Sequence, residues 1–460
     1  MRTTRCFCAF ALIAGAYGAE VHLPSGTALP WTSGGPREDA LPSFRFEPAG
    51  GRSKSGALII ETDARDGLDG NWTRTFPVSG GAFYRFAAWR RLRGVEFPSQ
   101  CAPVTIQWLD ATGKRVVDDR MLVERYLKGY DAPAPLEYPG EGATEKSGWT
   151  GLSQTLQAPS KAARAVVELH GRWAARSLME WSDVTFSVSE PPTPRIVRLA
   201  TIHFRPEAGK TPEDKRKQFA PLIAEAARQK ADLVVLPETL TFFNTGLSPA
   251  QTAEPVPGPS TEYFAELARR HKIYIVAGLF ERDTYKVYNV AVLLSPEGKL
   301  AGKYRKVTLP DSEAAAGVIP GRDYPVFQTR FGTLGIMICY DGFFPEVARE
   351  LTRRGAEIIA WPVWGCNPDL ARARAAENHV YLVSSTYEDV THNWMLSAVW
   401  DHSGDTIALA KEWGTVAVAE VNLSDTTRWR SLGDFRSKLA PHAPMTTASP
   451  GFTAPKLPLR

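Results

Sequence analysis

The sequence predicts a protein of two parts, an all-β sandwich followed by a layered α/β fold. Residues 20–190 hold short apolar runs separated by clusters of Gly, Pro, Asp and Ser. Beyond residue 195, apolar strands alternate with amphipathic helices, the pattern of a layered α/β fold. Between the two lies Ser189-Glu-Pro-Pro-Thr-Pro194, with three prolines in four residues. Such a stretch is extended and stiff, and it marks the boundary between domains.

Several runs in the first part alternate apolar with polar residues, which is typical of strands in an antiparallel sandwich. Three tryptophans near its end, Trp149, Trp173 and Trp181, are either core residues or a platform for a ligand. The expected strands are 57–60, 83–86, 104–108, 165–169 and 184–188.

In the second part, the expected helices show apolar residues at helical spacing, and several of the expected strands are continuously apolar. The expected strands are 196–201, 232–237, 274–279, 289–295, 332–339, 357–362, 381–386 and 397–401. The expected helices are 213–230, 261–271, 345–354 and 370–378.

Composition excludes several classes of protein. A hydrophobic fraction of 43% and a charged fraction of 23% are ordinary for a globular chain of 460 residues and exclude long disorder, coiled coil and collagen. The net charge of +4 gives no support to nucleic-acid binding or to a polybasic membrane contact. After the N-terminus no apolar run is long enough to predict a membrane-spanning helix.

The first 18 residues resemble a signal peptide. A short basic start is followed by an apolar stretch over residues 6–16, and Ala16-Tyr17-Gly18 offers small residues at a cleavage site. We therefore expect a secreted or periplasmic protein, cleaved near Gly18. Cleavage leaves Cys101, Cys339 and Cys366, an odd number that leaves at least one thiol free.

Four residues with the chemistry of a catalytic site stand at strand ends or in the loops after them. Glu238 follows the run Leu-Val-Val-Leu-Pro237, Lys306 follows Lys303-Tyr-Arg305, Glu313 lies in the next loop, and Cys339 follows Gly335-Ile-Met-Ile338. In α/β sheets, ligands bind at the carboxyl ends of strands.

The chemistry of these residue types is complementary. A helix that begins near Pro345 is expected to lower the pKa of the Cys339 thiol and to help hold an oxyanion. A carboxylate can take the thiol's proton, and a lysine can stabilise a tetrahedral intermediate. Taken singly, each residue has a plain alternative: an inert buried cysteine, a solvated loop glutamate, or a lysine in a surface charge run.

Together, three segments resemble the nitrilase, or carbon–nitrogen hydrolase, superfamily. They are Leu-Val-Val-Leu-Pro-Glu238, Lys-Tyr-Arg-Lys306-Val-Thr-Leu-Pro, and Gly-Ile-Met-Ile-Cys339-Tyr-Asp-Gly-Phe-Phe-Pro-Glu, in the family's order and spacing. The resemblance spans residues 195 to 441. It implies a four-layer αββα sandwich that pairs into homodimers. The sequence departs from most members in having an exported β domain in front.

The resemblance also implies a role for each residue. Cys339 matches the nucleophile, Glu238 the general base, Lys306 the oxyanion-stabilising residue and the backbone N–H of Tyr340 a second oxyanion donor. Glu313 matches a second glutamate that positions substrate or water. We expect no cofactor and no metal, since the histidines form no spaced ligand cluster and HExxH is absent.

The sequence thus predicts a signal peptide (1–18), a β-sandwich accessory domain (19–190) and a carbon–nitrogen hydrolase domain (195–445). The expected substrate is a small linear amide, carbamoyl compound or nitrile. The accessory domain resembles galactose-binding and carbohydrate-binding modules, and a carbohydrate ligand on it is a separate hypothesis that the sequence leaves open. Two alternatives stay open: an N-acyltransferase with the same residues, and a carbohydrate- or surface-binding protein with an inactive hydrolase half. Four aromatic residues are candidates to line the substrate pocket: Trp361, Trp364, Tyr387 and Trp394.

Overall fold

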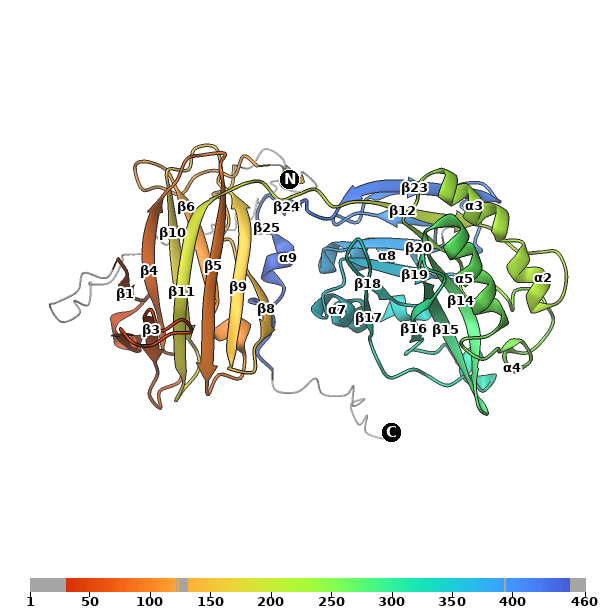
Figure 1. The fold of residues 1–460 in the computed structure, drawn as a ribbon, viewed down its shortest axis with the longest axis horizontal. Helices are drawn as coiled ribbons and strands as arrows, with labels where there is room; N and C mark the ends of the chain where they lie inside the picture. The colour runs from red at the N-terminus through yellow and green to blue at the C-terminus, as the bar shows by residue number, and fades with distance from the viewer. Residues whose placement is uncertain (1–29, 121, 124–130, 393, 447–460) are drawn as a thin grey trace, which may run out of the picture. The chain divides into compact units, whose positions relative to one another are not determined.

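A computed structural model describes residues 30–120, 122–123, 131–392 and 394–446 of the chain (Figure 1). The signal-peptide prediction for residues 1–18 lies outside the described residues. The chain divides into two compact units. The first unit consists of two segments, one that ends at Pro192 and one that begins at Arg428. The second unit is the segment between them, Thr193–Thr427.

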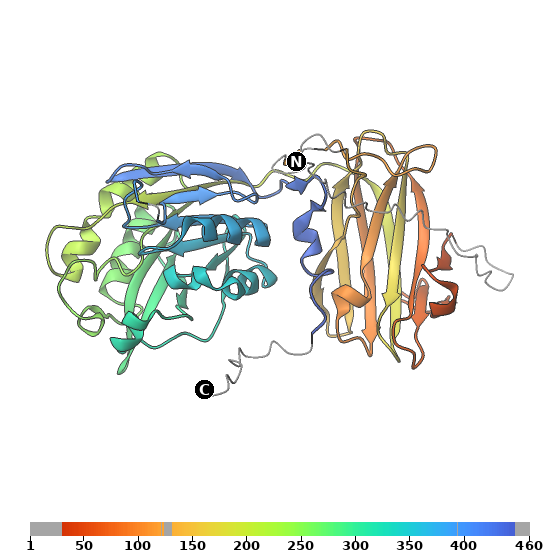
Figure 2. The ribbon, with the colours of Figure 1, turned by 180° about the vertical axis from the view of Figure 1, so that it is seen from behind.

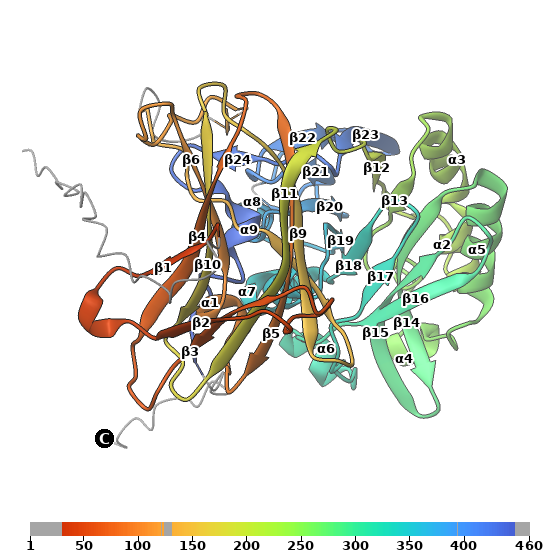
Figure 3. The same ribbon diagram turned by 60° about the vertical axis from the view of Figure 1, so that its left-hand side comes forward.

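Two antiparallel sheets form the first unit, with strand orders β1-β4-β10-β6 and β2-β3-β11-β5-β9-β8 (Figure 3). Their strands are β1 (Thr32–Gly34), β2 (Ser43–Glu47), β3 (Ala57–Glu61), β4 (Asp69–Pro77), β5 (Phe83–Arg93), β6 (Val104–Leu109), β8 (Gly140–Thr144), β9 (Trp149–Gln157), β10 (Arg164–Arg172) and β11 (Leu178–Ser189). Short helices η1 (Glu38–Ala40) and α1 (Pro98–Cys101) join them.

The core of the first unit lies between these two sheets. Trp72 and Trp108 from one sheet and Phe86 and Trp181 from the other are fully buried in a single apolar cluster. The predicted strands from 57 to 188 all fall within observed ones, so this unit is an all-β sandwich.

The three tryptophans with two possible roles, Trp149, Trp173 and Trp181, differ in burial. Trp181 and Trp149 are buried, whereas Trp173 is 40% exposed, with the Arg172 guanidinium 3.9 Å from its ring centroid. Two of the three therefore serve packing.

The end of the chain returns to the first unit, which differs from the predicted domain boundary at 445. Strand β24 (Arg428–Trp429) pairs in parallel with β7 (Leu122–Val123) and antiparallel with β25 (Gly433–Asp434). Helix α9 (Phe435–Lys438) follows, and Figure 2 shows this blue segment beside the strands of the first unit. The His442 ring nitrogen Nε2 lies 3.0 Å from the Tyr138 hydroxyl.

The second unit contains two six-stranded sheets, with orders β16-β15-β14-β13-β12-β23 and β17-β18-β19-β20-β21-β22. The pairs β12–β13–β14 and β18–β19–β20 are parallel, and the outer pairs are antiparallel. The strands are β12 (Ile196–His203), β13 (Leu233–Val235), β14 (Tyr274–Asp283), β15 (Lys286–Leu294), β16 (Leu300–Arg305), β17 (Val326–Gln328), β18 (Thr333–Ile336), β19 (Ile358–Pro362), β20 (Tyr381–Ser385), β21 (Ala398–Trp400), β22 (Thr406–Leu409) and β23 (Thr415–Asn422).

The helices of this unit are α2 (Pro212–Lys217), α3 (Ala220–Arg228), α4 (Pro249–Thr252), α5 (Pro259–His271), α6 (Asp311–Ala315), α7 (Pro345–Arg353) and α8 (Pro368–Asn378). Helices α3 and α5 cover the outer face of one sheet, and α7 and α8 cover that of the other. The sheets pack face to face through residues such as Leu199 and Ile336. Ile223 of α3 and Phe264 of α5 pack on one sheet, and Leu351 of α7 packs on the other (Figure 1). The predicted four-layer αββα sandwich is confirmed.

Two predicted elements of this unit are wrong in detail. The helix expected over 213–230 is two helices, α2 and α3, because Pro221 in the first turn of α3 has no N–H to continue α2. The strand expected over 332–339 ends at Ile336, and Cys339 instead begins the 3₁₀ turn η2 (Cys339–Phe343) with a φ of 40°. A left-handed φ ends the extended backbone. Among the described residues, no helix is long and apolar enough to cross a membrane.

Candidate active site

Glu238 is placed by a close approach between two strands. It follows the buried strand β13, which pairs with β14, and its residue is only 2% exposed. Gly278 of β14 lies against it: a Cβ at Gly278 would stand 2.6 Å from the Glu238 Cα and 2.7 Å from the Thr239 nitrogen. Only glycine lets the two backbones approach so closely.

Lys306 and Glu313 are placed by the end of strand β16 and the short helix after it. The Lys306 backbone N–H donates to the Asn289 carbonyl at 2.9 Å, which continues the pairing of β16 with β15. Its side chain is completely buried. Glu313 lies in α6, and its side chain is 16% exposed.

Cys339 sits on a sharp turn between β18 and α7. Its carbonyl accepts a hydrogen bond from the Trp361 indole nitrogen at 3.2 Å. The Trp361 ring covers Gly342 so closely that a Cβ at Gly342 would stand 1.9 Å from it. The turn can therefore form only with glycine at that position, and it presents Sγ 3.4 Å from the Gly365 carbonyl.

Asp341 fixes this turn from inside. Its carboxylate accepts hydrogen bonds from the Ile338 N–H at 2.9 Å and the Tyr304 hydroxyl at 2.7 Å. It also accepts from the N–H and the hydroxyl of Thr308, at 3.0 and 2.6 Å. Because Thr308 follows Lys306 by two residues, Asp341 connects the lysine loop to the cysteine turn.

The lysine and the two glutamates meet in one buried cluster. The Lys306 Nζ donates to Glu238 Oε1 at 2.8 Å and to Glu313 Oε1 at 2.5 Å. Glu238 Oε2 accepts the Trp364 backbone N–H at 2.9 Å. Sequence analysis predicted that these side chains would lie together, and the structure brings them together.

Asn289 belongs to the same cluster and was missed from the sequence. Its Nδ2 donates to Glu238 Oε1 at 2.7 Å and lies 3.1 and 3.2 Å from the two Glu313 oxygens. It lies in β15, where a single polar residue in an apolar run was the available signal. Its amide positions both carboxylates with respect to Lys306.

The pKa of the Cys339 thiol is shifted in the direction opposite to the one expected from the sequence. Burial raises the pKa of Cys339, and the Glu238 carboxylate raises it further, more than Lys306 lowers it. The prediction that the helix near Pro345 lowers this pKa is wrong, because Cys339 is desolvated.

The pKa values of the cluster are shifted as well. Burial alone would lower the pKa of Lys306, but the neighbouring Glu238, Cys339 and Glu313 outweigh burial and raise it. Burial raises the pKa of Glu313, and the charge of Glu238 adds to that rise, while Lys306 opposes it. Lys306 is therefore a cation in the resting protein.

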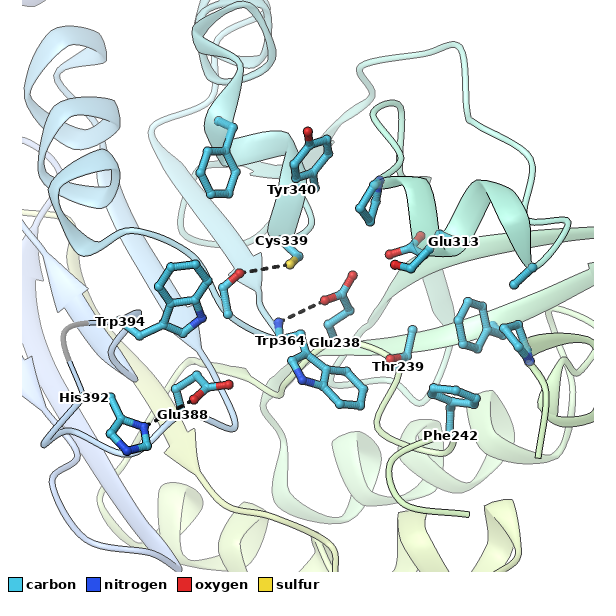
Figure 4. A pocket seen from close by; sticks show the side chains of 17 residues that line it. Glu238, Thr239, Phe242, Glu313, Cys339, Tyr340, Trp364, Glu388, His392 and Trp394 are labelled. Carbon is cyan, nitrogen blue, oxygen red and sulfur yellow. Dashed lines mark hydrogen bonds and ion pairs between the residues drawn. The ribbon is translucent and has the colours of Figure 1, made fainter. Parts of the chain in front are cut away.

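A cavity of about 970 Å³ opens onto the cluster (Figure 4). Its wall is mainly aromatic and apolar, with a few carboxylates. The lining residues are Glu238, Thr239, Phe242, Pro249, Phe280, Pro310, Ser312, Glu313, Ala316, Cys339, Tyr340, Phe343, Trp364, Gly365, Glu388, His392 and Trp394. Glu238, Glu313, Cys339 and Tyr340, four of the five predicted site residues, reach the cavity, and the fifth, Lys306, lies behind Glu238 and Glu313.

Of the four aromatic candidates, Trp364 and Trp394 line the cavity. Trp361 and Tyr387 are buried instead, and each supports the site from behind. Trp361 holds the Cys339 carbonyl, and the Tyr387 hydroxyl donates to the Glu238 carbonyl at 2.6 Å.

Neither of the other described cysteines lines the cavity. Cys101 is buried in the first unit, and burial raises the pKa of its thiol. Cys366 is buried, and burial raises its pKa to about 12. Within the described part of the chain, no group of three or more His, Cys, Asp and Glu side chains is arranged to hold a metal ion.

Comparison with known proteins finds similarity to one family. The family model for carbon-nitrogen hydrolase matches residues 210–431. A protein named nitrilase from Pyrococcus abyssi is 38% identical over 197 residues, covering 41% of this chain and 74% of that protein. The omega-amidase NIT2 of Xenopus tropicalis is 32% identical over 229 residues. This match covers 44% of this chain and 80% of the omega-amidase.

Among solved structures, Saccharomyces cerevisiae Nit3, a member of branch 10 of the nitrilase superfamily, matches with a TM-score of 0.44 and 26% identity. The match covers 49% of this chain and 90% of Nit3. Its sequence relatives show that the chain is an enzyme that acts on carbon–nitrogen bonds. It belongs to the carbon–nitrogen hydrolase family.

Proposed function

We propose that this enzyme hydrolyses a small linear amide, carbamoyl compound or nitrile through a thioester on Cys339, with Glu238 and Lys306 as its catalytic partners. The observation that carries the proposal is that three residues, distant in sequence, are brought together at one cavity and directly behind its wall. Cys339 and Glu238 line that cavity, and Lys306 is hydrogen-bonded to Glu238 at 2.8 Å. Figure 4 shows the Cys339 sulfur and the Glu238 carboxylate facing the same space.

The shifted pKa values favour Glu238 as the general base. The pKa of Lys306 is raised, so the lysine stays charged and cannot take a proton. The pKa of Cys339 is raised too, so the resting nucleophile is a neutral thiol. A neutral thiol needs a base that removes its proton as it attacks, and a carboxylate in the same cavity supplies one.

Acylation then follows in balanced steps. Cys339 Sγ attacks the amide carbon while its proton passes to Glu238. Lys306 and the Tyr340 N–H stabilise the oxyanion. An ammonium group has three N–H bonds, two of which are directed to Glu238 and Glu313, and we assign the third to the substrate oxygen. The C–N bond breaks, Glu238 returns the proton to the leaving nitrogen, and a thioester remains.

Deacylation uses the same base. Glu238 removes a proton from water as the water attacks the thioester carbon. The C–S bond breaks, the acid leaves, and the proton returns to Sγ. Glu313 contacts Lys306 and lines the cavity, and we assign it the positioning of the lysine and of the attacking water.

A substrate panel tests the proposal. Ammonia release is measured from primary amides, carbamoyl amino acids and nitriles, with wild-type protein and Cys339→Ala. We expect turnover of at least one class by the wild type and none by the variant. Turnover by Cys339→Ala at the wild-type rate would reject the thioester mechanism.

We also propose that the enzyme is exported, on the support of the basic and apolar pattern of residues 1–18. Sequencing the mature N-terminus from the native host tests this. A start at Ala19 agrees with cleavage after Gly18, and retention of Met1 contradicts export. A carbohydrate ligand on the first unit and pairing into homodimers remain predictions from the sequence.

A further inference from the structure

One carboxylate in the cavity has no part in the chemistry described above. Glu388 lies in the loop after β20 and lines the cavity with His392 and Trp394. Figure 4 shows these three grouped on one side of the cavity, away from Glu313 on the other. A substrate held at Cys339 therefore has room to extend toward Glu388.

The backbone that carries Glu388 is firmly held. The Arg205 guanidinium donates to the Tyr387 carbonyl at 2.6 Å, and the Tyr387 hydroxyl donates to the Glu238 carbonyl at 2.6 Å. The Glu388 N–H donates to the Thr386 hydroxyl at 3.2 Å, which in turn donates to the Trp364 carbonyl. Glu388 is thus fixed relative to the catalytic glutamate and to one aromatic wall, as a recognition group must be.

No lysine ammonium is shared with Glu388, in contrast to the other two carboxylates of the cavity. Glu238 and Glu313 share the Lys306 ammonium. The Glu388 side chain is 23% exposed, and the nearby imidazole of His392, 3.7 Å away, is 65% exposed. Among the described residues that line the cavity there is no lysine and no arginine. This side of the cavity is therefore negative.

The neighbouring aromatic rings suit a cation as well. Trp364 and Trp394 line the cavity and are 37% and 39% exposed. The face of an indole ring attracts an ammonium group within about 6 Å. A carboxylate flanked by indole rings recognises a positive, hydrogen-bond-donating group and disfavours a carboxylate.

We propose that Glu388 is the specificity-determining residue of this site and selects substrates whose acyl chain ends in an ammonium group. The inference rests on the proposed function, since it names the class of amide that the Cys339 site takes. The volume of about 970 Å³ leaves room for such a chain between Cys339 and Glu388.

Three primary amides with the same methylene chain test this: δ-aminovaleramide, hexanamide and the monoamide of adipic acid. They end in an ammonium, a methyl and a carboxylate group. For the wild type we expect kcat/KM to fall in that order, by roughly tenfold at each step, as one charge contact in a partly hydrated pocket predicts. Glu388→Gln should reduce the ammonium-to-carboxylate ratio by at least about tenfold, and Glu388→Lys should invert the preference.

Glu262→Gln is the matched control, because Glu262 is an exposed residue of α5 outside the cavity, and its ratio should equal that of the wild type. A ratio in Glu388→Gln equal to that of the wild type, or a wild-type preference for the adipic monoamide, would overturn the inference. Circular dichroism establishes that each variant is folded.

Binding separates a failure of this inference from a failure of the proposed function. Calorimetry with Cys339→Ala measures Kd for the same three amides without turnover. Tighter binding of the ammonium amide, weakened about tenfold in Cys339→Ala/Glu388→Gln, supports the inference even if no amide is hydrolysed. Equal Kd values for the three amides would reject it even if all three are hydrolysed.

Discussion

Replacing Glu313 by glutamine tests whether its carboxylate positions Lys306, because the substitution exchanges one carboxylate oxygen for an amide nitrogen. Glu313 Oε1 lies 2.5 Å from the Lys306 Nζ, and Asn289 Nδ2 lies within 3.2 Å of both carboxylate oxygens. Glutamine keeps the size of the side chain but removes its charge. The lysine then keeps one carboxylate, Glu238, and shifts toward it and away from the substrate.

The size of the effect follows from the lost contact. A hydrogen bond to a charged group contributes about 1.5–3 kcal/mol. Because each factor of ten in rate corresponds to about 1.4 kcal/mol, kcat of Glu313→Gln should fall roughly 10- to 100-fold. Glu313 acts on the lysine and the water, so KM should change far less than kcat.

Steady-state ammonia release gives kcat and KM separately, and urea unfolding shows that the variant is folded. Asp311→Asn is the matched control, because Asp311 is an exposed carboxylate in the same helix, α6. The control should match the wild type. A kcat for Glu313→Gln within a few-fold of wild type would refute the role assigned to Glu313.

Three further predictions follow from single residues. Gly278→Ala places a Cβ 2.6 Å from the Glu238 Cα, so the backbone must move, and we expect about 1–3 kcal/mol less stability in urea and a lower kcat. Asp341→Asn should lower the free energy of unfolding by about 2–4 kcal/mol, because the buried Asp341 carboxylate accepts hydrogen bonds from four donors. Its kcat should also fall, because the turn that carries Cys339 is displaced. Burial lowers the pKa of His203 from 6.5 to about 4. The unfolded chain therefore binds more protons between these pH values, and the free energy of unfolding should fall by up to about 3 kcal/mol as the pH drops through them. His203→Gln, compared in the same pH series, should flatten that decline.

The fold and the centre of the site were predictable because their signals are local. Strand β13 is a run of apolar residues, and Glu238 lies three residues after its end. Helices α5 and α7 carry apolar residues at helical spacing, and their predicted bounds lie within two residues of the observed ones. The motifs around Lys306 and Cys339 are contiguous segments that a family resemblance identifies.

The remaining features depend on contacts between distant segments. Asn289 is one polar residue in a strand, and its partners Glu238 and Glu313 are known only once β15 and α6 are placed. The pairing of Arg428 with Leu122 joins segments with no local signal for one another, so the return of the chain to the first unit was not expected. The raised pKa of Cys339 arises from burial, which a helix position in the sequence does not reveal.

The central claim is that Cys339 carries the acyl group during turnover. The protein is incubated with a substrate identified in the panel, quenched in acid, digested and examined by mass spectrometry. We predict a mass increase equal to that of the acyl group on the peptide that contains Cys339, absent in Cys339→Ala. An acyl group on the peptides of Cys366 or Cys101, with Cys339 unmodified, would contradict the claim.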